Sequence, residues 1–318
     1  MAAITLPAGS GSLAYQRRAF FVMAILFAAA PIVVYPVFLM KLMCFALFAC
    51  AFNLMIGYVG LLSFGHAMFF GMASYASAHA AKVWGFTPEL AILFGTAVAT
   101  ALGIITGALA IRRQGIYFAM VTLALAQMVF FFCLQAPFTG GEDGIQAVPR
   151  GHLFGVIPLS QMWAMYVLVL VVFLGGFLLL YRIVHSPFGQ VLKAIRENEP
   201  RAISLGYDVD RYKLLAFVLS AALTGLAGAT KALVFQLASL TDVHWTMSGE
   251  VVLMTLLGGL GTVFGPVVGA AIVITMENYL AQLGAWVTVV QGAVFVACVL
   301  AFRRGVIGEI GHWLKKPL

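Results

Sequence analysis

The sequence predicts an all-α, polytopic membrane protein, and its composition is the first reason. Hydrophobic residues make up 63% of the 318 residues and charged residues only 9%, with a mean hydropathy of +1.04. A soluble domain contains about 25% charged residues, so this chain has too few charges to cover a surface that faces water. Apolar runs of about 20 residues, the length that crosses the bilayer core as a helix, follow one another along most of the chain.

Ten apolar segments predict about ten membrane-embedded helices with short connections. The first segment is longer than the apolar region of a signal peptide, about 7–15 residues, so we interpret it as a retained helix. The eighth is short and ends in glycines, which leaves open whether it spans the membrane or is re-entrant. The segments cover residues 20–39, 41–58, 62–82, 88–111, 115–135, 160–182, 211–236, 249–263, 265–283 and 285–303.

The basic residues predict the orientation, because lysine and arginine concentrate in cytoplasmic loops. With the N-terminus in the cytoplasm, 14 of the 18 basic residues lie on the cytoplasmic side, and ten crossings return the C-terminus to the same side. Membrane orientation therefore explains the net charge of +7, and no nucleic-acid partner is expected. We predict a multi-pass protein of the bacterial cytoplasmic (inner) membrane, with lipid as its surroundings.

No low-complexity linker divides the chain, so residues 1–318 are expected to form a single transmembrane domain. Its parts outside the membrane are a cytoplasmic N-terminal tail (1–18), a cytoplasmic loop (183–210) and a cytoplasmic C-terminal tail (304–318). A sizeable loop on the outer side runs from Ala136 to Ser160.

Catalytic and metal-binding patterns are absent from the sequence. It has no G-x-x-x-x-G-K-[ST], no H-E-x-x-H and no G-x-S-x-G, and its four cysteines lie in apolar runs without metal-ligand spacing. We therefore predict that the chain is not an enzyme and holds no metal or cofactor. Only Glu250 and Glu277 are candidate intramembrane acids, which is weak support for a proton- or sodium-coupled carrier.

The cytoplasmic loop is the most informative stretch. Ser186 before Pro187 is a favourable start for a helix, and apolar residues then recur at helical spacing at Val191, Leu192 and Ile195. Pro200 is expected to break this helix or to start a second one. An amphipathic helix here can lie on lipid headgroups or dock a cytoplasmic protein, and its pattern alone does not choose between the two.

The same loop resembles a known family. The stretch S-P-F-G-Q-V-L-K-A-I-R-E-N-E-P-R-A-I-S-L-G, from Ser186 to Gly206, is similar to the coupling loop of branched-chain amino acid ABC importer permeases of the LivM type. One departure is Pro200, where the family is expected to have another residue. Four further stretches, in family order, resemble its glycine-containing motifs: Gly57–Ala67, Gly115–Leu123, Thr139–Ile145 and Leu257–Pro266.

The resemblance, which covers about residues 40–305, implies a permease subunit that moves branched-chain or related amino acids into the cytoplasm by alternating access. It implies four partners: a second, related permease, two cytoplasmic ATPase subunits that use ATP, and an external solute-binding protein. Urea, short amides and aromatic acids remain open as substrates. The alternatives are a secondary carrier or channel for a small polar solute, working without an ATPase, and a membrane enzyme.

The resemblance also predicts site residues. Those expected to couple to the ATPase are Pro187, Phe188, Lys193, Ala194, Arg196, Glu197, Asn198, Arg201 and Ala202. Candidates for the translocation pathway are Asn53, Ser63, His66, Thr122, Gln127, Lys231 and Glu250. Several candidates also have a packing interpretation: hydrogen bonds between helices for Asn53, Thr122 and Gln127, a bond to a backbone carbonyl for His66, and snorkelling to the outer headgroups for Lys231. The functional hypothesis for Lys231 is that it lies at the pathway mouth and attracts the carboxylate of a substrate.

Overall fold

The computed structural model describes residues 10–280, 286, 289–290, 292–293, 296–297 and 305–313. The tenth apolar segment (285–303), apart from a few isolated positions, and the outermost residues of both tails lie outside the described residues. The count of ten helices therefore stays a prediction.

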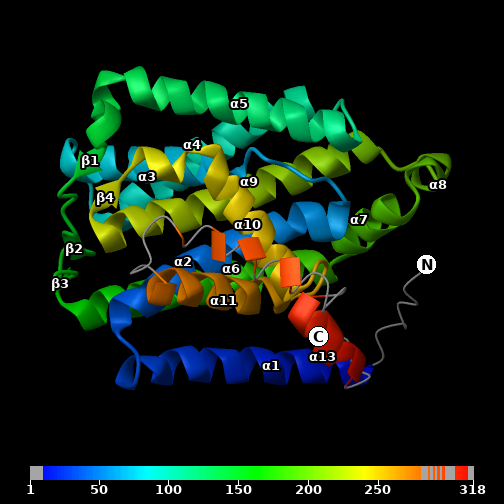
Figure 1. Ribbon diagram of the computed structural model, residues 1–318, viewed down its shortest axis with the longest axis horizontal. Helices are drawn as coiled ribbons and strands as arrows, with labels where there is room; N and C mark the ends of the chain where they lie inside the picture. Colours follow the sequence, from blue (N-terminus) through cyan, green and yellow to red (C-terminus); the bar gives the residue numbers. More distant parts are fainter. Residues whose placement is uncertain are drawn as a thin grey trace.

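The described part is almost entirely helical (Figure 1). The helices of the first half are α1 (Ser10–Ala29), α2 (Pro36–Asn53), α3 (His66–Lys82), α4 (Pro88–Ala110) and α5 (Gly115–Gln135). Those of the second half are α6 (Met162–His185), α7 (Pro187–Glu197), α8 (Glu199–Ser204), α9 (Val209–Phe235), α10 (Trp245–Gly258), α11 (Gly265–Leu280) and α13 (Gly305–Trp313). Short 3-10 turns are η1 (Ala30–Ile32), η3 (Pro137–Thr139), η4 (Gly141–Asp143) and η5 (Leu240–Asp242), and η2 (Leu54–Val59) is a π-helix.

Five helical spans in the described residues are long and apolar enough to cross a membrane. They are Pro36–Val59, Pro88–Ala110, Gly115–Gln135, Met162–His185 and Val209–Phe235. Together with the composition, they confirm an all-α, multi-pass membrane protein.

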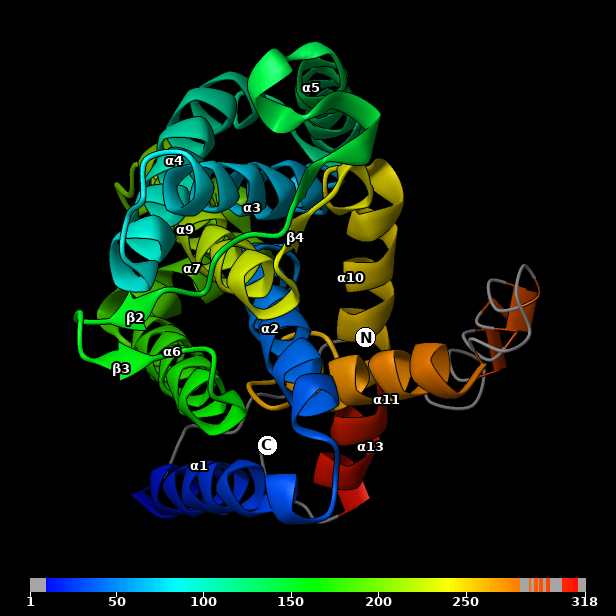
Figure 2. The ribbon, with the colours of Figure 1, turned by 90° about the vertical axis from the view of Figure 1, so that its left-hand side faces the viewer.

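Helix α9 forms the centre of the bundle, packed against α2, α3 and α4. Small residues allow the close approach between membrane helices. At Gly228, an added Cβ would lie 2.0 Å from the carbonyl oxygen of Phe70 on α3. Helices α1 and α5 lie at opposite edges of the bundle (Figures 1 and 2).

The two ends of the bundle differ. At one end lie the short strands β1 (Ile145–Gln146), β2 (His152–Leu153), β3 (Ile157–Pro158) and β4 (Leu237–Ala238), paired antiparallel as β1–β4 and β2–β3. At the other end lie α7 and α8 (Figure 1). The loop predicted outside and the loop predicted in the cytoplasm are thus at opposite ends of the bundle.

Two predicted segments differ from the structure. The run 20–39 is divided: α1 ends at Ala29, and α2 begins at Pro36. Prolines explain the division, because Pro31 and Pro36 each occupy a helix start, where the missing N–H costs nothing. The eighth segment, predicted at 249–263, is α10, whose 14 residues span about 21 Å and so fall short of the roughly 30 Å hydrocarbon core.

Candidate functional site

Helix α7 is built as the sequence predicts. The hydroxyl of Ser186 accepts a hydrogen bond from the backbone N–H of Gly189 (3.3 Å), and Pro187 occupies the first turn. The apolar side of the helix is buried, with Ile195 packed beside Ala202 and Val209. The prediction of an amphipathic helix is confirmed.

Pro200 starts a second helix. Helix α7 ends at Glu197, and Asn198 adopts an extended conformation (φ −158°). The Asn198 side chain then accepts a hydrogen bond from the backbone N–H of Arg201 (3.1 Å), which caps α8 with Pro200 in its first turn. Of the two outcomes expected for Pro200, the structure shows the second: a new short helix begins directly after α7.

Two basic side chains of α7 contact the π-helix η2. The Arg196 guanidinium donates a hydrogen bond to the backbone carbonyl of Gly57, and the Lys193 ammonium lies 5.6 Å from the centre of the Tyr58 ring. We call these four residues the coupling junction. They connect a helix outside the bundle directly to the end of the buried span α2–η2.

The electrostatics of the coupling junction favour this contact. Carbonyl groups at the end of a helix lack intrahelical partners and carry partial negative charge, which a cation stabilises. Arg196 supplies that cation at the end of η2. Burial lowers the pKa of Lys193, and the Glu197 carboxylate one turn along α7 opposes that shift.

The junction extends from η2 into the loop between α10 and α11. The side-chain amide of Asn53 donates to the carbonyl of Thr262 (2.8 Å), and its oxygen accepts from the N–H of Gly261 (3.1 Å). Gly261 also lies against the Arg196 guanidinium. Arg196 therefore contacts both η2 and the α10–α11 loop, which lie about 200 residues apart in the sequence.

Gly57 has no room for a side chain. An added Cβ would lie 2.2 Å from the Asn53 Oδ1 atom and 2.7 Å from the Gly261 nitrogen. We expect Gly57→Ala to lower stability by roughly 1–3 kcal/mol through overpacking, measured as thermal unfolding in detergent. Gly175→Ala is the matched control, because nothing lies within 4 Å of its added Cβ on α6. Equal melting temperatures for the two variants would contradict this account.

The remaining predicted coupling residues divide by exposure. Pro187, Ala194, Glu197, Asn198 and Arg201 are exposed, whereas Ala202 is buried. Phe188 stacks on Tyr212, with ring centres 5.7 Å apart. We call Pro187, Ala194, Glu197, Asn198 and Arg201 the outward set; Arg196 is exposed as well, but it and Lys193 contact η2 and form the inward set.

Sequence reasoning missed several residues of this region. The exposed apolar side chains of Ile203, near the end of α8, and of Leu205 and Tyr207, after it, extend the outward surface. In the sequence, they could have been recognised as apolar residues close together in the most polar loop. Glu199 also accepts from Lys213 (2.6 Å) and from Gln114 (2.9 Å), which ties α8 to α9 and to the loop before α5.

Two pathway candidates, Thr122 on α5 and Ser63 in the turn before α3, are buried and hydrogen-bonded. The Thr122 hydroxyl accepts from the N–H of Phe64 (3.2 Å), and the Ser63 hydroxyl accepts from the N–H of Gly65 (3.2 Å). Gln127 is half-buried on α5. Thr122 and Ser63 therefore hold the turn that precedes α3.

His66 bonds to a hydroxyl rather than to the carbonyl that the packing interpretation predicts. Its Nε2 lies 2.9 Å from the Ser220 hydroxyl, which itself donates to the Ala51 carbonyl (2.6 Å). Because Ser220 uses its single proton on Ala51, Nε2 of His66 is the donor. The aromatic rings of Phe52, Phe69 and Phe217 enclose the imidazole edge-on.

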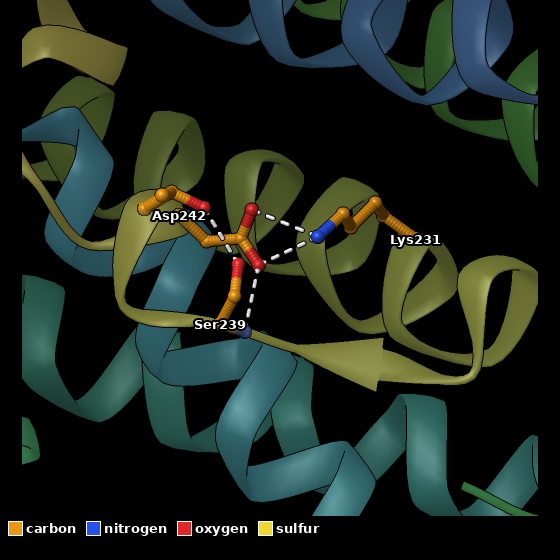
Figure 3. Close-up of polar contacts among 4 residues, drawn as sticks. Lys231, Ser239 and Asp242 are labelled. Atoms are coloured by element: carbon orange, nitrogen blue, oxygen red, sulfur yellow. Dashed lines mark hydrogen bonds and ion pairs between the residues drawn. The ribbon is translucent and has the colours of Figure 1, made fainter. Parts of the chain in front are cut away.

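Lys231 forms a buried ion pair that sequence reasoning did not foresee. Its ammonium lies 2.8 and 2.6 Å from the two carboxylate oxygens of Asp242 (Figure 3). Lys231 is 8% exposed and Asp242 2% exposed, so the lysine does not reach the outer headgroups. Asp242 is the first acidic residue after Lys231 in the sequence, and this closeness could have indicated the ion pair.

The last candidate, Glu250 on α10, is half-buried near Lys41 on α2 and Glu277 on α11. Within the described residues, no group of three or more His, Cys, Asp or Glu side chains is arranged to hold a metal ion.

A multi-pass helical bundle with broken helices is typical of membrane transport proteins. Residues 36–299 match the sequence model of the family described as "Branched-chain amino acid transport system / permease component". The chain belongs to this family, and the resemblance of its motifs is confirmed.

Known relatives agree with this assignment. The chain is 25% identical to the high-affinity branched-chain amino acid transport system permease protein LivM of Salmonella typhimurium (strain LT2) and to that of Escherichia coli (strain K12). Each match covers 98% of this chain and 79% of the relative. It is 29% identical to the ribose import permease protein RbsC of Bacillus subtilis (strain 168), over 70% of each chain. No solved structure matches the chain.

Proposed function

We propose that this permease works in an ATP-driven importer for branched-chain or closely related amino acids. The coupling junction is the observation that carries the proposal, since a carrier working alone has no use for an external helix fixed to its broken spans. The LivM relatives, named as branched-chain amino acid transport permeases, support the substrate class.

The proposed complex has a second, related permease, two cytoplasmic ATPases and a solute-binding protein on the outer side. ATP is bound and hydrolysed by the ATPases, and this chain supplies no catalytic group or cofactor. Because the solute-binding protein recognises the substrate, the permease itself needs only a low affinity for it.

The two faces of α7 and α8 have different roles in this mechanism. The outward set (Pro187, Ala194, Glu197, Asn198 and Arg201), with Ile203 and Leu205, docks on an ATPase. The inward residues Lys193 and Arg196 transfer the movement of the docked helix to η2 and to the α10–α11 loop. Association of the ATPases then rocks the permeases between inward-facing and outward-facing states.

The arrangement of the bundle supports the proposed topology. Helix α13 and the beginning of α1 lie at the end of the bundle that carries α7 and α8 (Figure 1). With this end in the cytoplasm of a bacterium, residues 1–18, 183–210 and 304–318 lie on the cytoplasmic side of one transmembrane domain of about ten helices.

The test is transport by the complex purified from its native membranes and reconstituted in proteoliposomes with its binding protein. We expect uptake of radiolabelled leucine that requires ATP in the compartment of the ATPases and is inhibited by excess isoleucine or valine. Inhibition by excess urea or an aromatic acid, but not by these amino acids, would change the assigned substrate. Leucine uptake without ATP would replace the importer by a secondary carrier.

A further inference from the structure

Three charged side chains from three helices form a cluster outside the coupling junction. Lys41 on α2 pairs with Glu277 on α11, with Nζ and Oε2 3.0 Å apart. Glu250 lies on α10, which packs against both α2 and α11, and within the described residues it makes no hydrogen bond or ion pair of its own. The cluster therefore contains one cation, one paired carboxylate and one carboxylate without a partner among those residues.

The cluster lies within apolar helices and not in the loops that join them. Lys41 and Glu250 each follow the first residue of their helix by five positions, about 8 Å along the axis. Helix α2 begins at the end of the bundle opposite α7 (Figure 1), which is the outer end in the proposed topology, and Glu277 is paired with Lys41 there. The cluster thus lies in the outer part of the membrane domain.

The cluster is also partly open at the surface of the chain. The side chain of Lys41 is 32% exposed and that of Glu277 is 21% exposed. Ionisable groups within membrane helices are costly to expose to lipid, and they face a water-filled cavity or other protein groups instead. The face that carries them therefore does not contact lipid.

Other helices show what a lipid-facing surface looks like in this chain. Leu93 on α4, Met120 on α5 and Val171 on α6 are each more than 60% exposed and apolar. Helices α10 and α11 lie on the side of α2 away from α4 and α6 (Figure 2). The charges therefore mark one side of the bundle, formed by α2, α10 and α11.

We propose that Glu250, Lys41 and Glu277 line the outer part of the translocation pathway and receive both charges of a zwitterionic amino acid. Glu250 accepts the α-ammonium group, because it is the carboxylate without a partner among the described residues. The Lys41 ammonium, beside Glu277, is placed to meet the α-carboxylate. This inference rests on the proposed function. It adds the place in the pathway where the ammonium and carboxylate groups of the substrate each meet an opposite charge.

The test is the accessibility of a cysteine at Glu250 in the assembled complex. Glu250→Cys is labelled in proteoliposomes with a membrane-impermeant, positively charged methanethiosulfonate, against the background of the parent complex. We expect labelling that slows several-fold when leucine, binding protein and ATP are present. Leu93→Cys is the matched control, since Leu93 is 62% exposed in the isolated chain but should face lipid and remain unlabelled.

The outcomes separate the inference from the proposed function. If the parent complex takes up leucine with ATP while Glu250→Cys stays unlabelled, or is labelled without protection by leucine, the pathway site is wrong and the importer stands. If the parent shows no ATP-dependent uptake, the proposed function itself fails.

If the complex with Glu250→Cys does not assemble, a second variant at the same position tests the inference. We expect Glu250→Gln to lower leucine uptake about tenfold, the loss of one charged contact, while ATP hydrolysis continues in the assembled complex. Uptake by Glu250→Gln at the parent rate would overturn the inference.

Discussion

Replacing Arg196 by alanine is expected to lower ATP-dependent uptake at least about tenfold while the ATPases stay bound. The reason is the direction of the side chain: the guanidinium contacts Gly57 of η2, while the exposed side chains of Ala194, Glu197, Asn198 and Arg201 are all retained. ATP hydrolysis in this complex should continue without transport, because the docked helix no longer moves η2. Uptake, hydrolysis and co-purification of the ATPases from the same preparation measure the three effects.

Two matched variants make this result specific. Arg182→Ala removes the same charge from an exposed position on α6, outside the coupling junction, and should transport at nearly the parent rate. Arg201→Ala alters the outward surface and should instead weaken co-purification of the ATPase. Loss of the ATPase from Arg196→Ala, or uptake at the parent rate, would contradict the inward role of Arg196.

The coupling helix shows how far local sequence reasoning reaches. Ser186 and Pro187 are adjacent, so their cap and first turn could be predicted from propensity alone. The direction of Arg196 could not, because it depends on a contact with Gly57 that lies 139 residues away. Nothing in the amphipathic pattern of α7 distinguishes a basic residue that faces the permease from one that faces a partner.

Sequence reasoning is also limited for the membrane helices, but for a different reason. High hydropathy identifies spans, but it does not show where an apolar run is divided, as at Pro31 and Pro36, or how much of it is helical, as in α10. Polar residues inside such runs are equally ambiguous. Asn53 was a candidate for the pathway, and in the structure both ends of its amide are occupied by the α10–α11 loop.

The Lys231–Asp242 pair illustrates a contact that needs the fold of a loop. Lys231 lies on α9, and Asp242 reaches it only because β4 and η5 turn back along the helix (Figure 3). The carboxylate also accepts a hydrogen bond from the N–H of Ser239 (3.3 Å), which fixes it at the turn. The pair therefore holds the turn formed by β4 and η5 against α9.

Neutralising only one member of this pair should destabilise the permease strongly. Lys231→Met leaves the Asp242 carboxylate buried without its cation, and removing one partner of a buried ion pair costs about 3–5 kcal/mol. Asp242→Asn leaves a buried ammonium and should also lower stability.

The Lys231→Met/Asp242→Asn double variant removes both charges and keeps an oxygen that can accept from Ser239, so it should be more stable than Lys231→Met. Thermal unfolding of the four proteins in one detergent measures this non-additivity. Additive losses in the double variant, or a Lys231→Met protein as stable as the parent, would mean that the ammonium is not needed to neutralise Asp242. The hypothesis of a substrate-attracting lysine at the pathway mouth would then be favoured again.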